Sequence, residues 1–363
     1  MRPSVADLLR NPGTAFSLSL SDWDLLVPQL RQTRLLGTLR SLLAAQSDDD
    51  RKIPQEVWRH LDAGWLLHQK QRHSLDYELQ HLVSALAEVD EPVLLLKGAA
   101  YLCGDLAPAA GRLISDIDIL VHANKLPRIE NVLSSYGWSA GAIDPYNERY
   151  YRRWMHEIPP LGHVERGSTL DVHHTLLPPT CDVAIDPSTL WAEARELQPG
   201  VKVLCPVDMV IHSAAHLFHE GEFDHGLRDL WDLDCLLRHF VKTEGADFYP
   251  QLLQRASDMK LLRPLYYALR YASSFFATPV DLAALQSMGL QQPSSAQIKL
   301  MDFLFVRAFT PKHSACRLSG TGLAEFSLYL RSHYLRMPLR LLLPHLIRKA
   351  WMDCFPAAAS SKN

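Results

Sequence analysis

The chain has 363 residues, of which 47% are hydrophobic and 21% charged, a composition typical of a globular protein with a sizeable core. Its net charge of −3 gives no overall attraction to a polyanion, so we expect no long nucleic acid as a partner. No apolar run approaches the ~20 residues of a membrane-spanning helix, so no transmembrane segment is expected. The scattered cysteines and the lack of an apolar signal-peptide core predict a cytoplasmic protein with reduced thiols.

Residues 1–90 form a predicted N-terminal helical segment. Ser21-Asp22 indicates a helix start, and leucines at three- and four-residue spacing follow it. A polar break and Pro54 precede a second, longer helical stretch. Because amphipathic helices usually bury one face, we interpret this segment as a helical cap on the next part of the chain.

Residues 91–205 form a predicted core in which the hydrophobic period changes. The short apolar runs PVLLL and DIDILV indicate two buried strands, and WSAGAI is a candidate third. The runs HEIPPLGHV and STLDVHHTLL predict a hairpin. The expected result is a small mixed β-sheet with helices on one side.

Residues 206–352 are predicted to form a C-terminal helical bundle, and residues 353–363 a frayed tail. The whole chain is therefore predicted to be an α+β protein. The end of the bundle carries a run of basic residues: Arg331, Arg336, Arg340, Arg348 and Lys349. We interpret them as a solvated basic face over a leucine core; the alternative is a surface for a membrane or an anionic acceptor.

Three carboxylates carry the predicted chemistry. Asp116 and Asp118 alternate along one strand and so share a face, and Asp171 lies on a later strand. Carboxylates from two adjacent strands can hold Mg²⁺, or Mn²⁺ in its place, and such ions stabilise an in-line phosphoryl displacement. We predict that all three residues are metal ligands and catalytic, and that Asp171 can also act as the base.

The residues before these carboxylates are candidates for binding nucleotide phosphates. The turn at Lys97-Gly98 can bring backbone N–H groups to a phosphate, and Arg112 and Ser115 precede Asp116 on a loop. Other interpretations stay open: Gly98 as a tight turn only, Lys97 as a strand end in solvent, and Arg112 as an ion-pair partner of one of the aspartates.

Together these motifs are similar to a bacterial family of uncharacterised nucleotidyltransferases in the DNA polymerase beta-like nucleotidyltransferase superfamily. The resemblance rests on LLLKGAA, on Arg112-x-x-Ser115-Asp116-Ile117-Asp118 and on Leu170-Asp171-Val172-His173, and it covers residues 20–310. One departure is that the superfamily's glycine usually precedes a serine, whereas Ala99 follows Gly98 here.

The resemblance implies transfer of a nucleoside monophosphate, most simply AMP from ATP, to an acceptor, with release of pyrophosphate. The acceptor is expected to be a small molecule, a peptide or protein side chain, or an RNA end. Because pockets favour domain junctions, we expect it between the core and the helical bundle, with His173, His212 and His216 as possible cleft residues.

A cluster of histidines supports the main rival hypothesis, a metal-dependent hydrolase. His212, His216 and His219 follow at four- and three-residue spacing, which on an α-helix places them on one face. Acidic residues and His225 are close by, although no hydrolase signature is present. The other interpretations are a packed helix and a polar helix lining the acceptor cleft.

Asp229 and Asp232 in the same region are expected to pair with Arg228 or the histidines and to hold the bundle to the sheet. A protein that keeps the nucleotidyltransferase fold but only binds a partner is the third hypothesis.

Overall fold

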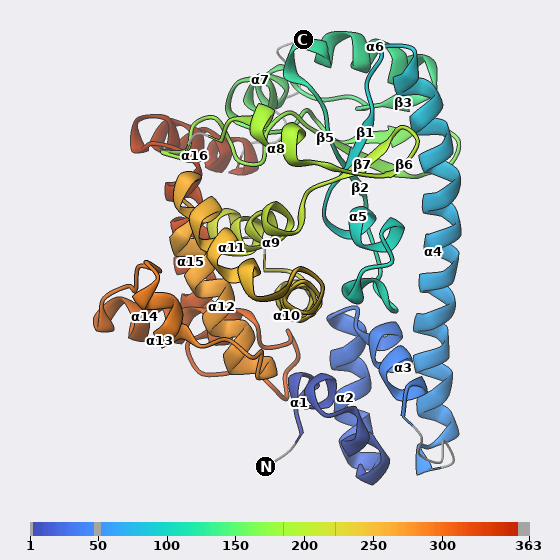
Figure 1. Cartoon of the computed structure of the whole chain (residues 1–363), viewed down its shortest axis with the longest axis vertical. Helices are drawn as coiled ribbons and strands as arrows, with labels where there is room; N and C mark the ends of the chain where they lie inside the picture. Colours follow the sequence, from blue (N-terminus) through green and yellow to red (C-terminus); the bar gives the residue numbers. More distant parts are fainter. Residues whose placement is uncertain (1–2, 47–51, 184, 222, 355–363) are drawn as a thin grey trace.

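The structure is a computed structural model, which describes residues 3–46, 52–183, 185–221 and 223–354 (Figure 1). It is an α+β fold, as predicted, with helices on either side of the sheet-containing part in the sequence. Of the predicted tail, residues 355–363 lie outside the described residues. The domain boundaries at residues 90 and 205 stay a prediction.

A mixed sheet of seven strands forms the centre of the core, in the order β3-β4-β5-β2-β1-β7-β6. β2 pairs in parallel with β5 and antiparallel with β1, which pairs in parallel with β7, and β4 and β5 form the predicted hairpin. The strands are β1 (Val93–Leu95), β2 (Ile117–Leu120), β3 (Trp138–Ser139), β4 (Leu161–His163), β5 (Thr169–His173), β6 (Arg195–Gln198) and β7 (Val201–Val203). The apolar runs are thus the central strands, and every residue of β1 and β2 is buried.

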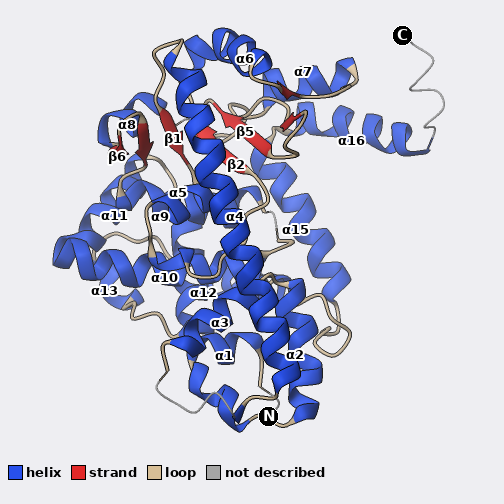
Figure 2. Ribbon diagram, turned by 90° about the vertical axis from the view of Figure 1, so that its right-hand side faces the viewer, coloured by secondary structure: helices blue, strands red, loops and turns tan. Residues whose placement is uncertain are grey.

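The N-terminal segment is helical, as the leucine spacing predicts. It contains α1 (Val5–Arg10), α2 (Leu20–Gln32), α3 (Leu36–Ala44) and α4 (Gln55–Ala87). α2 begins slightly earlier than expected, because Ser19 is its N-cap and forms a capping box with Asp22. The 33 residues of α4 span about 50 Å and run from the N-terminal helices to the sheet (Figures 1 and 2).

Four helices connect the strands of the core: α5 (Lys97–Cys103), α6 (Leu126–Ser135), α7 (Pro145–Trp154) and α8 (Pro187–Glu193). α5 begins directly where β1 ends, and the chain then returns through a loop into β2. This short connection places the Lys97-Gly98 turn beside the start of the D-x-D strand, since β1 and β2 are paired neighbours.

The C-terminal bundle follows the last strand. It contains α9 (Pro206–Ala215), the π-helical turn η5 (His216–Glu220), α10 (Gly226–Glu244), α11 (Phe248–Asp258), α12 (Leu262–Phe276), α13 (Leu282–Ser287), α14 (Ser295–Ala308), α15 (Thr321–Arg336) and α16 (Leu339–Cys354). Aromatic rings fill its centre, where Phe218 contacts Tyr271 and Phe305. No helix in the described part of the chain is both long and apolar enough to cross a membrane.

The basic run at the end of the bundle is not one solvated face. Arg331 is half-buried: its Nη1 donates to the Phe218 carbonyl at 2.6 Å, and its guanidinium lies over the Phe305 ring. Arg340 and Arg348 are exposed on α16, which projects away from the bundle, and the side chain of Lys349 lies outside the described part (Figure 2). The prediction was wrong for Arg331, because the aromatic core supplies a carbonyl and ring faces that hold a guanidinium inside.

Candidate active site

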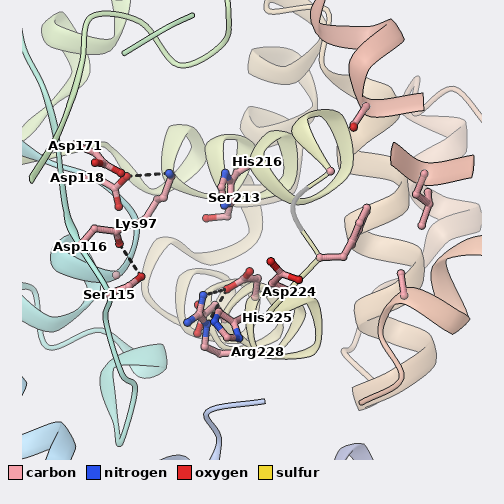
Figure 3. Close-up of a pocket in the computed structure, with 18 of the residues that line it drawn as sticks. Lys97, Ser115, Asp116, Asp118, Asp171, Ser213, His216, Asp224, His225 and Arg228 are labelled. Atoms are coloured by element: carbon pink, nitrogen blue, oxygen red, sulfur yellow. Dashed lines mark hydrogen bonds and ion pairs between the residues drawn. The ribbon is translucent and has the colours of Figure 1, made fainter. Parts of the chain in front are cut away.

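The three predicted carboxylates lie together on the sheet. In the parallel pairing of β2 with β5, Asp118 is directly opposite Asp171, and Asp116 lies two positions before Asp118. The alternation of a strand puts Asp116 and Asp118 on one face. Figure 3 shows the three side chains gathered on one side of a cleft. The register thus brings together carboxylates that are far apart in the sequence.

Asp118 is held as a buried carboxylate with two partners. Its Oδ1 accepts from Lys97 Nζ at 2.9 Å and lies 3.0 Å from His173 Nε2, and the residue is only 4% exposed. Burial acts to raise the pKa of Asp118, but the Lys97 charge and the His173 hydrogen bond outweigh it and hold that pKa well below its usual range. Lys97 is therefore a counter-ion of the carboxylate, rather than a strand end in solvent.

Asp116 is more open than Asp118. It is half-buried, and its Oδ1 accepts from Ser115 Oγ at 3.0 Å. Ser115 is exposed and lies, like Asp116, on the wall of the cleft. These two residues present polar oxygen atoms where a bound phosphate or cation could be contacted.

Gly98 is needed for close packing behind the turn. A Cβ at this position would lie 2.1 Å from Arg112 Nη1 and 2.8 Å from Ile114 Cγ2. Lys97 has a φ of 45°, so the chain enters α5 through a left-handed conformation that is uncommon for a lysine. Ala99 is fully buried and does not line the cleft. The turn therefore packs against Arg112, and its role in phosphate binding stays a prediction.

Arg112 links the core to the helical bundle. It is 6% exposed, its Nε donates to Asp232 Oδ2 at 2.8 Å, and its Nη2 lies 4.0 Å from Asp229 Oδ1. The aspartates that it pairs with thus belong to α10, and not to the D-x-D strand. Burial raises the pKa of Asp232 to about 6 against the opposing effect of Arg112. For Asp229, the charges of Arg228 and Arg112 outweigh burial and lower its pKa.

A cleft of about 860 Å³ lies between the sheet and the bundle. The predicted residues Lys97, Gly98, Arg112, Ser115, Asp116, Asp118, Asp171 and His216 all line it. Figure 3 shows three residues across from the carboxylates: His216 on η5, Asp224 in the turn before α10, and Arg228 on α10. Its volume is in the range of ligand-binding pockets, and it lies at the junction where we expect the acceptor.

Two of the predicted cleft histidines do not line the cleft. His173 is fully buried beside Asp118, and His212 is 3% exposed inside the bundle. Only His216 of the three is on the cleft wall. Strand and helix periodicity place a residue on a face without saying whether another element covers that face, so a role of His173 and His212 in acceptor binding stays a prediction.

The predicted histidine cluster is also divided. α9 ends at Ala215 and the chain continues as a π-helical turn, which changes the angular spacing, so that His219 is buried while His216 faces the cleft. Among the described residues, the one group whose ligand atoms come within 4.8 Å of one another is His156, Glu157 and His173. The residue Glu222 and the side chain of Glu220 lie outside the described part.

The sequence did not point to two sets of residues at this site. His156 and Glu157 precede the hairpin, and Glu157 forms an isolated bridge to His173; the His-Glu dipeptide was the one available signal. Tyr329, His333 and Arg336 of α15 line the far wall of the cleft. Nothing in the local sequence of α15 indicates that this late helix returns to the core.

The chain belongs to the family described as uncharacterised nucleotidyltransferase, whose model matches residues 19–277. The resemblance found in the sequence is thereby confirmed, and the family indicates nucleotidyl transfer and a nucleotide substrate. A search of the curated proteins gave no match. The chain is also similar to the solved structure "Crystal structure of JHP933 from Helicobacter pylori", with 16% identity over 73% of this chain and 96% of that chain and a TM-score of 0.30, too low to inform the site.

Proposed function

We propose that the protein transfers a nucleoside monophosphate from a nucleoside triphosphate, most simply ATP, to an acceptor, and that it uses Mg²⁺ or Mn²⁺. The observation that carries the proposal is the strand register that sets Asp118 opposite Asp171, with Asp116 beside them, on the wall of the 860 Å³ cleft. The reaction joins an acceptor oxygen to the α-phosphorus and releases pyrophosphate.

The proposal that the carboxylates hold a divalent metal rests on their chemistry. They offer oxygen ligands, which Mg²⁺ prefers, and Asp118 already holds a cation, the Lys97 ammonium, 2.9 Å from its Oδ1. Its low pKa keeps this carboxylate ionised at neutral pH. When bound, the metal would supply charge stabilisation for the attacking and leaving oxygens.

The other residues of the sheet wall hold and orient the substrates. Asp171 accepts the proton of the acceptor hydroxyl. Lys97 and Ser115, which line the cleft beside the carboxylates, contact phosphate oxygens, with the Gly98 turn behind them. Arg112 keeps the loop that carries Ser115 and Asp116 in place through its ion pair with α10.

The acceptor is proposed to bind against the helical wall. α15 contributes Tyr329, His333 and Arg336 to the cleft, and it lies beyond residues 19–277 that match the family. We therefore expect acceptor choice to depend on α15, while the carboxylates carry chemistry common to the family.

The test is incubation of the full chain with each α-³²P-labelled nucleoside triphosphate, Mg²⁺ and a lysate of the source organism. The expected result is a labelled acceptor whose formation falls by about a thousandfold in Asp116→Asn, an effect of the size seen when an electrostatic stabiliser is removed. Asp182→Asn, an exposed carboxylate outside the cleft, is the matched control and should keep full activity.

Two outcomes would contradict the proposal. Full activity of folded Asp116→Asn would remove the carboxylates from the mechanism. Absence of any labelled product, together with no Mg²⁺-dependent nucleotide binding by the wild type, would favour a protein that keeps the fold and only binds a partner. Arg336→Gln should lower acceptor labelling while nucleotide binding is retained. This result would distinguish a role of the helical wall in acceptor binding from the role of the sheet wall in nucleotide binding.

A further inference from the structure

A second cluster of metal-binding side chains lies directly beside the carboxylates. His156 and Glu157 follow α7, and the bridge between Glu157 and His173 brings them against β5. The ligand atoms of the three residues all lie within 4.8 Å of one another. His156 is 5% exposed and His173 fully buried, whereas Glu157 is half-buried, and His156 and Glu157 line the cleft.

One distance in this cluster is close to the edge of a tetrahedral zinc site. His173 Nε2 is 3.5 Å from Glu157 Oε2 and 3.0 Å from Asp118 Oδ1. A zinc ion with ligands at 2.0–2.1 Å separates those ligands by about 3.4 Å. The 3.5 Å between His173 and Glu157 is close to this value, whereas Asp118 is not part of the group whose ligand atoms lie within 4.8 Å of one another.

We propose that His156, Glu157 and His173 bind a zinc ion. Two imidazoles favour zinc over Mg²⁺, which prefers a set of oxygen ligands. His173 binds through Nε2 as the neutral imidazole that carries its proton on Nδ1. Three protein ligands leave the fourth position of a tetrahedral zinc for water or a substrate atom.

The proposed zinc joins two segments of the core. It ties the residues after α7 to β5 through His173. His173 Nε2 also lies 3.0 Å from Asp118 Oδ1, so the metal would sit beside the carboxylates proposed for the transfer reaction. The site differs from the predicted histidine cluster of α9 and η5, and it does not depend on the proposed transfer activity.

The test measures metal content and thermal stability, without nucleotide. The full chain is stripped with a chelator, loaded with Zn²⁺ and passed through a desalting column. We expect about one zinc per chain and a melting temperature about 5 °C higher than that of the stripped protein. Glu157→Gln, which keeps the shape of the side chain, should bind zinc at least about tenfold more weakly, and so should His156→Ala.

Two matched histidine variants complete the experiment. His174→Ala removes the partly buried neighbour of His173, and His216→Ala removes the cleft histidine of the bundle. Both should keep the zinc. The proposal is overturned if the wild type retains almost no zinc, if folded Glu157→Gln binds it as tightly as wild type, or if the metal is lost in His216→Ala.

Discussion

The two walls of the cleft are built by different means. On the sheet wall, Asp118 and Asp171 are neighbours because two central strands pair in one register. On the helical wall, Tyr329 and Arg336 face the cleft because a helix near the end of the chain packs against the bundle. A strand register is strongly specified where the strands are buried, whereas the placement of a helix depends on every surface that it touches.

The two walls also differ in whether they lie within the part of the chain that matches the family. The carboxylates lie within residues 19–277, which match the family, and α15 lies outside them. This agrees with the proposal that the sheet wall carries the chemistry and the helical wall selects the acceptor. Arg112 connects the two walls, so changes around it test whether they act as one site.

The largest effect on stability is expected from Arg112→Ala. This change leaves Asp232 and Asp229 buried without the arginine, and breaking a buried pair from one side costs about 3–5 kcal/mol of the free energy of unfolding. Denaturant unfolding followed by circular dichroism measures the loss. The control is Arg152→Ala, which removes an exposed ion pair with Glu130 and should cost less than about 1 kcal/mol. Equal losses in the two variants would show that Arg112 does not hold the walls together.

A smaller effect is expected from Gly98→Ala. The added methyl group would meet Arg112 Nη1 at 2.1 Å, and Arg112 cannot move aside without leaving Asp232. We expect a loss of about 2 kcal/mol in the free energy of unfolding, typical of overpacking a tight contact. Gly162→Ala is the matched control, since a Cβ there would meet only the Ser139 carbonyl oxygen, at 3.9 Å. If both variants are equally stable, the glycine is not required for this packing.

The sequence was most informative where function depends on strand alternation. The run around Asp116 predicted a buried strand and the run around Asp171 a strand of a hairpin, and the structure contains both strands. β6 had no such signal, because all four of its residues are exposed at the edge of the sheet and need no apolar pattern. The fold class could therefore be predicted from the apolar runs, whereas the edge strand β6 could not.

The helical wall could not be predicted in the same way. The π-helical turn at His216 breaks the regular spacing that the histidine hypothesis assumed. Arg331 looked like a surface residue, but the aromatic core encloses it. In both places the outcome depends on contacts between distant segments, which a periodic pattern does not contain.

The smallest predicted effect concerns stability in acid. The titratable groups of the two walls are expected to lose their stabilising contributions in different pH ranges. On the helical wall, burial lowers the pKa of His225 to about 4, and the charges of Arg228 and Arg34 add to this shift. The ordinary pKa of a histidine is 6.5, so between pH 4 and pH 6.5 the unfolded state binds more protons at His225 than the folded state does. The contribution of His225 to stability is therefore complete above this range and falls as the pH drops through it. On the sheet wall, the pKa of Asp118 is lowered as well, but a carboxylate with a lowered pKa stabilises the fold at every pH above its ordinary value of 3.8 and loses this contribution only below it.

Melting temperatures of the wild type and of His225→Gln between pH 7 and pH 4.5 test this difference. The wild type should lose stability as the pH falls, and His225→Gln should lose less, because its side chain has no proton to take up on unfolding. Some pH dependence should remain in the variant, since burial also lowers the pKa values of His68 and His174. His239→Gln, in the helix α10 that His225 precedes as its N-cap, is the control and should follow the wild type. Parallel curves for the wild type and His225→Gln would mean that protonation of the helical wall does not limit stability in mild acid, and the contrast between the two walls would then rest on geometry alone.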